Sequence, residues 1–124
     1  MSASISPTPK YKVGQAVYCL FPFADDEGQS KDRPAIILGV IIENNKVQYQ
    51  VAKLTKTNQT GRFKGIWINK ESKKGKTLGL SFDSFIHLQQ IISVPEFAIR
   101  RLMGNCSFMD EIKIYCSDNG IQLK

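Results

Sequence analysis

Apolar and polar positions divide the first three quarters of the chain into predicted strands. Residues 47–54 alternate between apolar and polar side chains, which predicts a half-buried strand. Residues 34–43 form an almost continuous apolar segment, which is typical of a strand buried on both faces. The turn at residues 44–46 tolerates positive φ, so we expect these two strands to pair. Further strands are predicted over residues 15–21, 65–68 and 84–94.

Polar, turn-rich segments separate these strands and are predicted to be loops. Residues 22–33 are acidic and, at twelve residues, long for a hairpin loop, which is typical of a functional or mobile segment. Residues 55–64 and 69–79 are also predicted to be loops.

The C-terminal third changes to the spacing of helices. Serine, proline and glutamate within residues 93–96 resemble a capped helix start, and the predicted helix ends at Gly104. A second capping box begins at Ser107 and predicts a helix that ends near residues 118–120. A small, strongly bent antiparallel sheet followed by one or two helices predicts an α+β domain built on a small β-barrel.

The length of 124 residues predicts one compact domain, and 42% hydrophobic with 23% charged residues is a globular composition. We expect residues 1–12 to be a flexible N-terminal tail and residues 13–124 to form the domain. The longest apolar run, residues 35–42, is far shorter than the ~20 residues of a membrane helix, so no membrane association is expected.

Compartment and metal content are predicted from the tail and the cysteines. The first ten residues lack the cationic start and apolar segment of a signal peptide. The three cysteines, Cys19, Cys106 and Cys116, are odd in number and form no C-x-x-C pair. We therefore expect buried apolar thiols, no disulfide scaffold, no metal site and a cytoplasmic protein.

The net charge of +6 is concentrated in residues 53–76. This segment contains eight lysine or arginine residues and only one acidic residue, Glu71. Phe63 and Trp67 are interleaved with these cations, so the segment could hold phosphates while aromatic rings stack on bases. The alternative is a solvated loop with Trp67 in the core. Seven residues are candidates for RNA binding: Lys53, Lys56, Arg62, Lys64, Lys73, Lys74 and Lys76.

Five segments, in their order and spacing, resemble the MazF/PemK family of bacterial toxins. They are Val-Gly-Gln-Ala-Val-Tyr at 13–18, Phe-Pro-Phe-Ala-Asp at 21–25, Arg-Pro-Ala-Ile-Ile-Leu at 33–38, Val-Ala-Lys-Leu-Thr at 51–55, and Asp-Ser at 83–84 with Gln-Ile-Ile-Ser-Val at 90–94. Gln15 stands where the family has an aspartate. The resemblance implies an SH3-like barrel of the MazF/PemK/CcdB type, a homodimer, and a cognate antitoxin that lays an acidic segment into the basic groove.

The resemblance also implies a ribonuclease site. Arg33 is the first candidate, because a guanidinium binds two phosphate oxygens at once and lies here between a long loop and a buried strand. Thr55 is the second, as a hydroxyl donor at a strand end, with Thr57 as the alternative if the alignment shifts by two. Glu27 is the candidate proton acceptor among the three acids at residues 25–27.

The single histidine, His87, lies in a predicted strand, where a structural or interface role is favoured over a catalytic one. One histidine excludes ribonuclease or protease chemistry that needs two from one chain, although a homodimer could supply one from each protomer.

The first hypothesis for function is a toxin that cleaves single-stranded RNA without metal or cofactor, at short sequence motifs. The second is a non-catalytic nucleic-acid-binding module on the same fold. The third is a gyrase-poisoning toxin of the sister family. That family ends in Trp-Gly-Ile, whereas residues 120–124 contain no tryptophan, which disfavours this third hypothesis.

Overall fold

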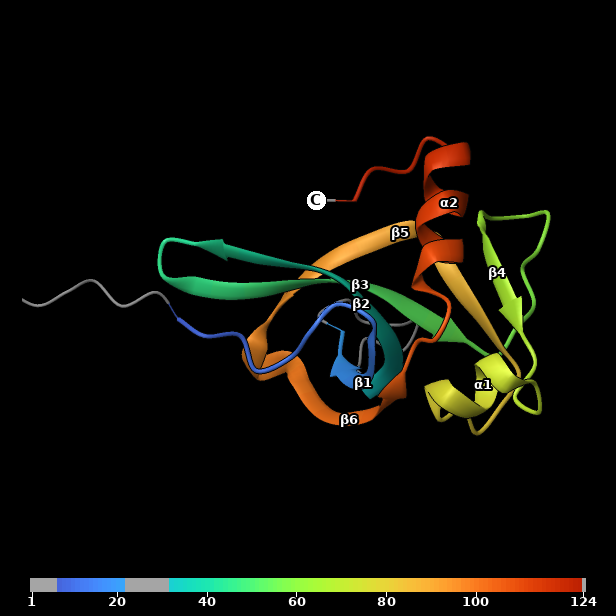
Figure 1. Ribbon diagram of the computed structural model, residues 1–124, viewed down its shortest axis with the longest axis horizontal. Helices are drawn as coiled ribbons and strands as arrows, with labels where there is room; N and C mark the ends of the chain where they lie inside the picture. The colour runs from blue at the N-terminus through green and yellow to red at the C-terminus, as the bar shows by residue number, and fades with distance from the viewer. Residues whose placement is uncertain (1–6, 22–31, 124) are drawn as a thin grey trace, which may run out of the picture.

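The computed structural model describes residues 7–21 and 32–123. Six strands form one antiparallel sheet in the order β4-β5-β3-β2-β1-β6 (Figure 1). The strands are β1 (Gln15–Leu20), β2 (Asp32–Glu43), β3 (Lys46–Thr55), β4 (Gly65–Ile68), β5 (Ser84–Pro95) and β6 (Ile99–Asn105). The helical elements are α1 (Lys73–Leu78), a 3₁₀ turn η1 (Glu96–Ala98) and α2 (Met109–Asp118).

Every strand expected from the hydrophobic pattern is present. β2 and β3 pair in antiparallel register, and Asn44 and Asn45 between them adopt φ of 52° and 62°. This left-handed backbone is the conformation that short hairpin turns require and that asparagine tolerates. Most of the predicted loop at residues 22–33 lies outside the described residues, and β2 begins at Asp32.

β2 is buried on both faces, as its continuous apolar sequence predicts. Ile36 and Leu38 face a cluster that includes Ile112 of α2. The alternate position, Ile37, faces a second cluster that includes Ile99 at the start of β6. Because successive side chains of a strand point to opposite faces, both clusters share this one strand as a common wall.

The helix predicted from residue 93 to Gly104 is wrong. β5 continues to Pro95, a single 3₁₀ turn follows, and β6 then pairs with β1. The Glu96 carboxylate does not cap a helix, because its Oε2 accepts hydrogen bonds from the Tyr49 hydroxyl at 2.6 Å and the Lys10 amide at 3.1 Å. β6 forms hydrogen bonds with the backbone groups of β1 on the side that does not pair with β2. This pairing between distant segments outweighs the local capping signal.

The loop predicted at residues 69–79 contains a short helix, α1. The Ser72 hydroxyl accepts a hydrogen bond from the Gly75 amide at 3.0 Å, and Gly79 ends the helix at φ 77°. Leu78 is fully buried and anchors α1 in the core.

The second predicted helix is confirmed as α2, which ends at Asp118. The capping box expected at Ser107 is wrong, because Phe108 is the N-cap without a side-chain hydrogen bond and the Ser107 hydroxyl bonds to the Thr77 hydroxyl at 3.1 Å.

The α+β class is therefore confirmed, with two helices packed on an antiparallel sheet. β4 and β6 are the edges of the sheet and, over the described residues, do not pair with each other, so closure into a barrel is not confirmed. In the described ranges, no helix has the length and apolarity needed to cross a membrane.

The N-terminal segment is attached to the domain before residue 13. The Lys10 amide donates to Glu96, and the Tyr11 ring packs edge-on against Tyr49 at 5.8 Å between centroids. Residues 10 and 11 of the expected flexible tail are thus bonded to the domain. Residues 1–6 lie outside the described residues, and the domain boundary at residue 13 stays a prediction.

Candidate functional site

Arg33 and Thr55, two of the three catalytic candidates, line one cavity of about 450 Å³. Five strands and the segments that follow β3 and precede β5 contribute to its wall. The lining residues are Tyr18, Asp32, Arg33, Pro34, Leu54, Thr55, Lys56, Thr57, Leu80, Ser81, Phe82, Ser84 and Met103. Because polar and apolar groups from several elements converge on this hollow, it is the candidate active site.

The register of the central strands brings the two candidates together. Arg33 is the second residue of β2 and lies opposite Cys19 of β1. On the other side of β2, Ala35 lies opposite Lys53 of β3. Arg33 and Thr55, the last residue of β3, each lie two residues beyond this pair, at the same end of the two strands. Both side chains are half-buried, on well-supported strand ends.

The Thr55 hydroxyl is only weakly engaged within the protein. Its Oγ1 donates to the Thr57 carbonyl at 3.4 Å, a long distance for a hydroxyl hydrogen bond. The hydroxyl is therefore available to a ligand in the cavity. Thr57 lines the same cavity and is more exposed, so both threonines that the alignment allows are present at the site.

Glu27, the candidate proton acceptor, lies outside the described residues. The carboxylate that the structure places at the cavity is Asp32, which the sequence did not single out. Its Oδ1 lies 3.5 Å from Nε of Arg100 on β6. This ion pair offsets the negative charge beside Arg33 and leaves the cavity more attractive to an anion.

The seven basic residues predicted to bind RNA lie in different parts of the fold. Lys56 lines the cavity. Lys74 forms an ion pair with Glu111 of α2 at 2.6 Å, and Lys64 donates to the Asn119 carbonyl just after α2 at 2.9 Å. The other six candidates lie outside the cavity wall. Their role in RNA binding stays a prediction.

His87 has the surroundings of a structural residue. It is buried between the rings of Phe63 and Phe85, with centroids 5.1 and 5.8 Å away. Its Nδ1 is buried without a hydrogen-bond partner in the described part of the chain. Burial, followed by the charge of Lys53, lowers the pKa of His87, which favours the neutral ring at neutral pH.

Trp67 is half-buried on β4, in contrast to the expectation of a core position. It borders a hollow of about 530 Å³ against α2, where Ile114 and Tyr115 form the opposite side. β4 is an edge strand, so among the described residues no further strand flanks it on its outer side.

The prediction of buried thiols is confirmed for Cys19 and Cys116, whereas Cys106 is only partly buried. All three cysteines are free. Burial, with a smaller contribution from Asp32, raises the pKa of Cys19 to about 11. A thiol with so high a pKa is protonated at neutral pH and is a poor nucleophile.

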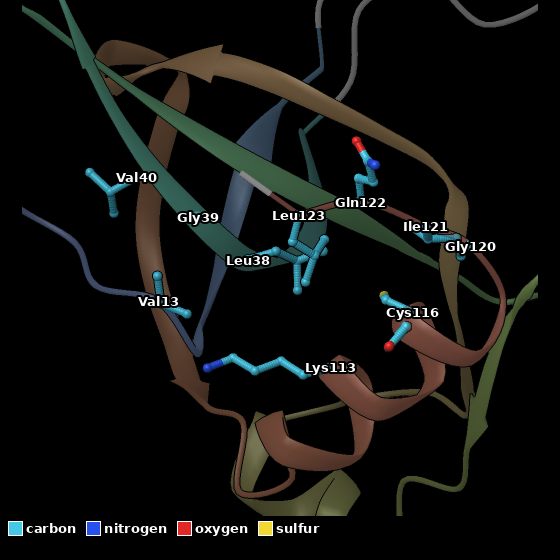
Figure 2. A pocket seen from close by; sticks show the side chains of 11 residues that line it. Val13, Leu38, Gly39, Val40, Lys113, Cys116, Gly120, Ile121, Gln122 and Leu123 are labelled. Carbon is cyan, nitrogen blue, oxygen red and sulfur yellow. The ribbon is translucent and has the colours of Figure 1, made fainter.

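A second hollow, of about 820 Å³, lies between β2 and the C-terminal residues (Figure 2). Figure 2 shows Leu38 and Leu123 near its centre and Cys116 entering from α2. None of the candidate residues for catalysis or RNA binding that the structure describes lines this hollow. The candidate site is therefore the cavity at Arg33 and Thr55.

Comparison with known proteins identifies the family. Among curated proteins, none matches this chain. A family model described as PemK-like, MazF-like toxin of type II toxin–antitoxin system matches residues 12–114. This range includes every described residue of the cavity wall. The chain therefore belongs to the PemK-like, MazF-like toxins of type II toxin–antitoxin systems.

Proposed function

We propose that this toxin is an endoribonuclease that cleaves single-stranded RNA in the cytoplasm at short sequence motifs and so inhibits translation and growth. One observation carries the proposal. Arg33 and Thr55, which lie 22 residues apart in the sequence, line the same cavity together with Lys56. A guanidinium, a hydroxyl and an ammonium around one hollow suit a phosphate that gains negative charge during reaction.

The proposed reaction uses the RNA as its own nucleophile. The 2′-oxygen attacks phosphorus, the bond from phosphorus to the 5′-oxygen breaks, and the products are a 2′,3′-cyclic phosphate and a 5′-hydroxyl. Arg33 stabilises the charge on the non-bridging oxygens in the transition state, and Thr55 donates a hydrogen bond to one of them. The 2′-hydroxyl proton goes to a base, for which Glu27 stays the candidate, and the departing 5′-oxygen gains a proton.

Membership in a type II family implies an antitoxin partner for this toxin. We propose that the antitoxin covers the same cavity with an acidic segment, because carboxylates can replace the RNA phosphates beside Arg33 and Lys56. We also propose that the toxin acts as a homodimer, as the resemblance to MazF and PemK implies.

Incubation of the purified protein with long single-stranded RNA, in the presence of a chelator, tests the proposed function. We expect cleavage at a small number of short motifs, with cyclic phosphate and 5′-hydroxyl ends identified by end mapping. Arg33→Ala tests the site, and Lys46→Ala at the exposed β2–β3 turn is the matched control.

Two results would overturn this function. Cleavage that stops in chelator and returns with a divalent metal contradicts the proposed mechanism. Full cleavage and toxicity from a folded Arg33→Ala variant contradict the site and favour the non-catalytic or gyrase-directed alternatives.

A further inference from the structure

Two aromatic rings line the candidate cavity, and each carries a cation above it. The Lys56 ammonium lies 3.9 Å from the centroid of the Phe82 ring. The Arg101 guanidinium carbon lies 4.2 Å from the centroid of the Tyr18 ring. A ring beside a cation is the combination with which proteins hold single-stranded nucleic acids, since the ring stacks on a base and the cation binds a phosphate.

The Phe82 ring is exposed, yet its backbone is fixed. About half of the residue, 51%, is accessible to solvent, although it is a large apolar side chain. Its carbonyl accepts a hydrogen bond from the Ser84 hydroxyl at 2.9 Å. The next residue, Asp83, accepts one from the Lys70 amide at 2.9 Å. A ring on a backbone that is fixed before the ligand arrives loses less conformational entropy on binding than one on an unattached loop.

Arg101 presents a charge that is not neutralised within the described ranges. It lies directly opposite Tyr18 in the pairing of β1 with β6, so its place above the ring follows from strand register. The neighbouring Arg100 forms an ion pair with Asp32 at 3.5 Å. No carboxylate in residues 7–21 and 32–123 pairs with Arg101, and its side chain is exposed.

From these contacts, and resting on the proposed ribonuclease function, we infer that Phe82 is a base-stacking platform and Arg101 a phosphate-binding residue. They hold the nucleotides on either side of the phosphate that contacts Arg33. The base displaces the Lys56 ammonium from the ring, and this ammonium then binds a neighbouring phosphate. Stacking on a phenylalanine accepts any base, so Phe82 contributes affinity and placement, and sequence selection arises elsewhere.

A fluorescent base tests the platform directly. The probe is a short single-stranded RNA that spans a mapped cleavage site, with a 2′-deoxy sugar at the scissile nucleotide and 2-aminopurine beside it. Binding of the wild type quenches the fluorescence through stacking. Phe82→Leu keeps an apolar side chain but removes the ring, so we expect the quenching to be lost and the Kd to rise roughly 5- to 100-fold. Phe97→Leu, at a ring that is 72% exposed on η1, is the control.

Salt dependence tests Arg101. We expect Arg101→Gln to reduce the slope of log Kd against log salt by about 0.7, the value for one phosphate contact on a single strand. Lys113→Gln, an exposed cation on α2, is the control and leaves the slope unchanged. For Phe82→Leu and Arg101→Gln alike, KM for cleavable RNA rises much more than kcat falls, because the groups bind substrate without touching the reacting atoms.

The two proposals fail in different ways. A wild type that cleaves no RNA overturns the proposed function and this inference together. A wild type that cleaves RNA, with equal quenching in wild type and folded Phe82→Leu, overturns the platform alone. An unchanged salt slope in folded Arg101→Gln overturns the phosphate contact alone. Circular dichroism melting establishes that each variant is folded.

Discussion

The cavity at Arg33 and the face covered by α2 both carry basic side chains, but the two regions use them differently. At the cavity, Lys56 lies over the Phe82 ring and has no carboxylate within ion-pair distance in the described part of the chain. At α2, Lys74 forms a 2.6 Å ion pair with Glu111, and Lys64 donates to the Asn119 carbonyl. Lys74 of α1 and Lys64 before β4 thus hold parts of the protein together, whereas Lys56 remains available to an external anion.

This difference changes the interpretation of the basic segment at residues 53–76. A run of charge in the sequence suggests one continuous surface for RNA. In the fold, the run passes from the end of β3 through β4 to α1, and its members meet different neighbours. Local partners, and not the number of lysines, decide which charges act on a ligand. Four predictions test this comparison, in order of decreasing effect.

Arg33→Ala gives the largest effect. The substitution removes a permanent charge from the transition state, so we expect cleavage to fall by ~10²-fold or more, while a half-buried position at a strand end, outside the core, leaves the fold intact. Initial cleavage rates and thermal melting measure the two consequences. In cells, growth arrest disappears although the protein accumulates and still binds its antitoxin. Lys74→Ala, at the α2 face, should retain nearly full activity, and a comparable loss there would remove the distinction between the two regions.

Thr55→Val has the next largest effect. Valine keeps the branched shape but lacks the hydroxyl, and a neutral hydrogen bond is worth about half a charged one, so we expect a loss of ~10- to 10²-fold. Thr57→Val is the matched comparison at the same cavity. Parallel measurements of kcat/KM for the two variants identify the catalytic threonine. A larger loss for Thr57→Val would show that the family alignment is shifted by two residues.

The salt dependence of RNA binding by Lys56→Gln and Lys74→Gln tests whether the two lysines differ in phosphate binding. A lysine that binds a phosphate releases about one counterion, so Lys56→Gln should flatten the slope of log Kd against log salt by about 0.7. Lys74→Gln should leave this slope unchanged, because its ammonium is already paired with Glu111. The measurement is anisotropy of uncleavable single-stranded RNA between about 50 and 200 mM salt. A flatter slope for Lys74→Gln alone would place the RNA across α2.

Five of the six strands and the second helix could be predicted from the sequence, because burial imposes a period that is visible in the residues themselves. The alternation at residues 47–54 and the apolar run at residues 34–43 both became strands at those positions. The helix expected up to Gly104 failed for a tertiary reason. Glu96, which looked like part of a capping box, bonds to Tyr49, which lies 47 residues away in the sequence.

The site could be predicted only in part. Arg33 and Thr55 came from the family resemblance, and the fold places them at one cavity. Phe82 carried no clear local signal, because Leu78 and Leu80 nearby are apolar as well and only the fold separates the buried Leu78 from the exposed Phe82. Arg101 carried none, because its place above Tyr18 depends on the register of β6 against β1. Strand register across a sheet depends on contacts between distant segments, which a single sequence does not reveal.

The hydrogen bond from Tyr49 to Glu96 lies outside both regions and gives the smallest effect. It requires a protonated phenol and an ionised carboxylate. Burial, followed by the bond to Glu96, raises the pKa of Tyr49 to about 12, and the bond from Tyr49 lowers the pKa of Glu96 below its ordinary 4.5. The stabilisation is therefore fully present between about pH 5 and pH 10. It is lost as the pH falls through the lowered pKa of Glu96, or rises from 10 towards 12.

Tyr49→Phe keeps the buried ring and removes this bond, together with the hydrogen bond that the hydroxyl accepts from the Tyr11 amide at 3.2 Å. We expect the free energy of unfolding at pH 7 to fall by about 1 kcal/mol, and its dependence on pH to become flatter at both extremes. Tyr11→Phe, at the ring that packs against Tyr49, is the matched control. Urea unfolding across the pH range measures the effect, and cleavage at pH 7 should stay at the wild-type rate. If Tyr49→Phe instead reduced cleavage as strongly as Thr55→Val, the active site would depend on the β5–η1 junction, and the cavity could not be treated as an independent region.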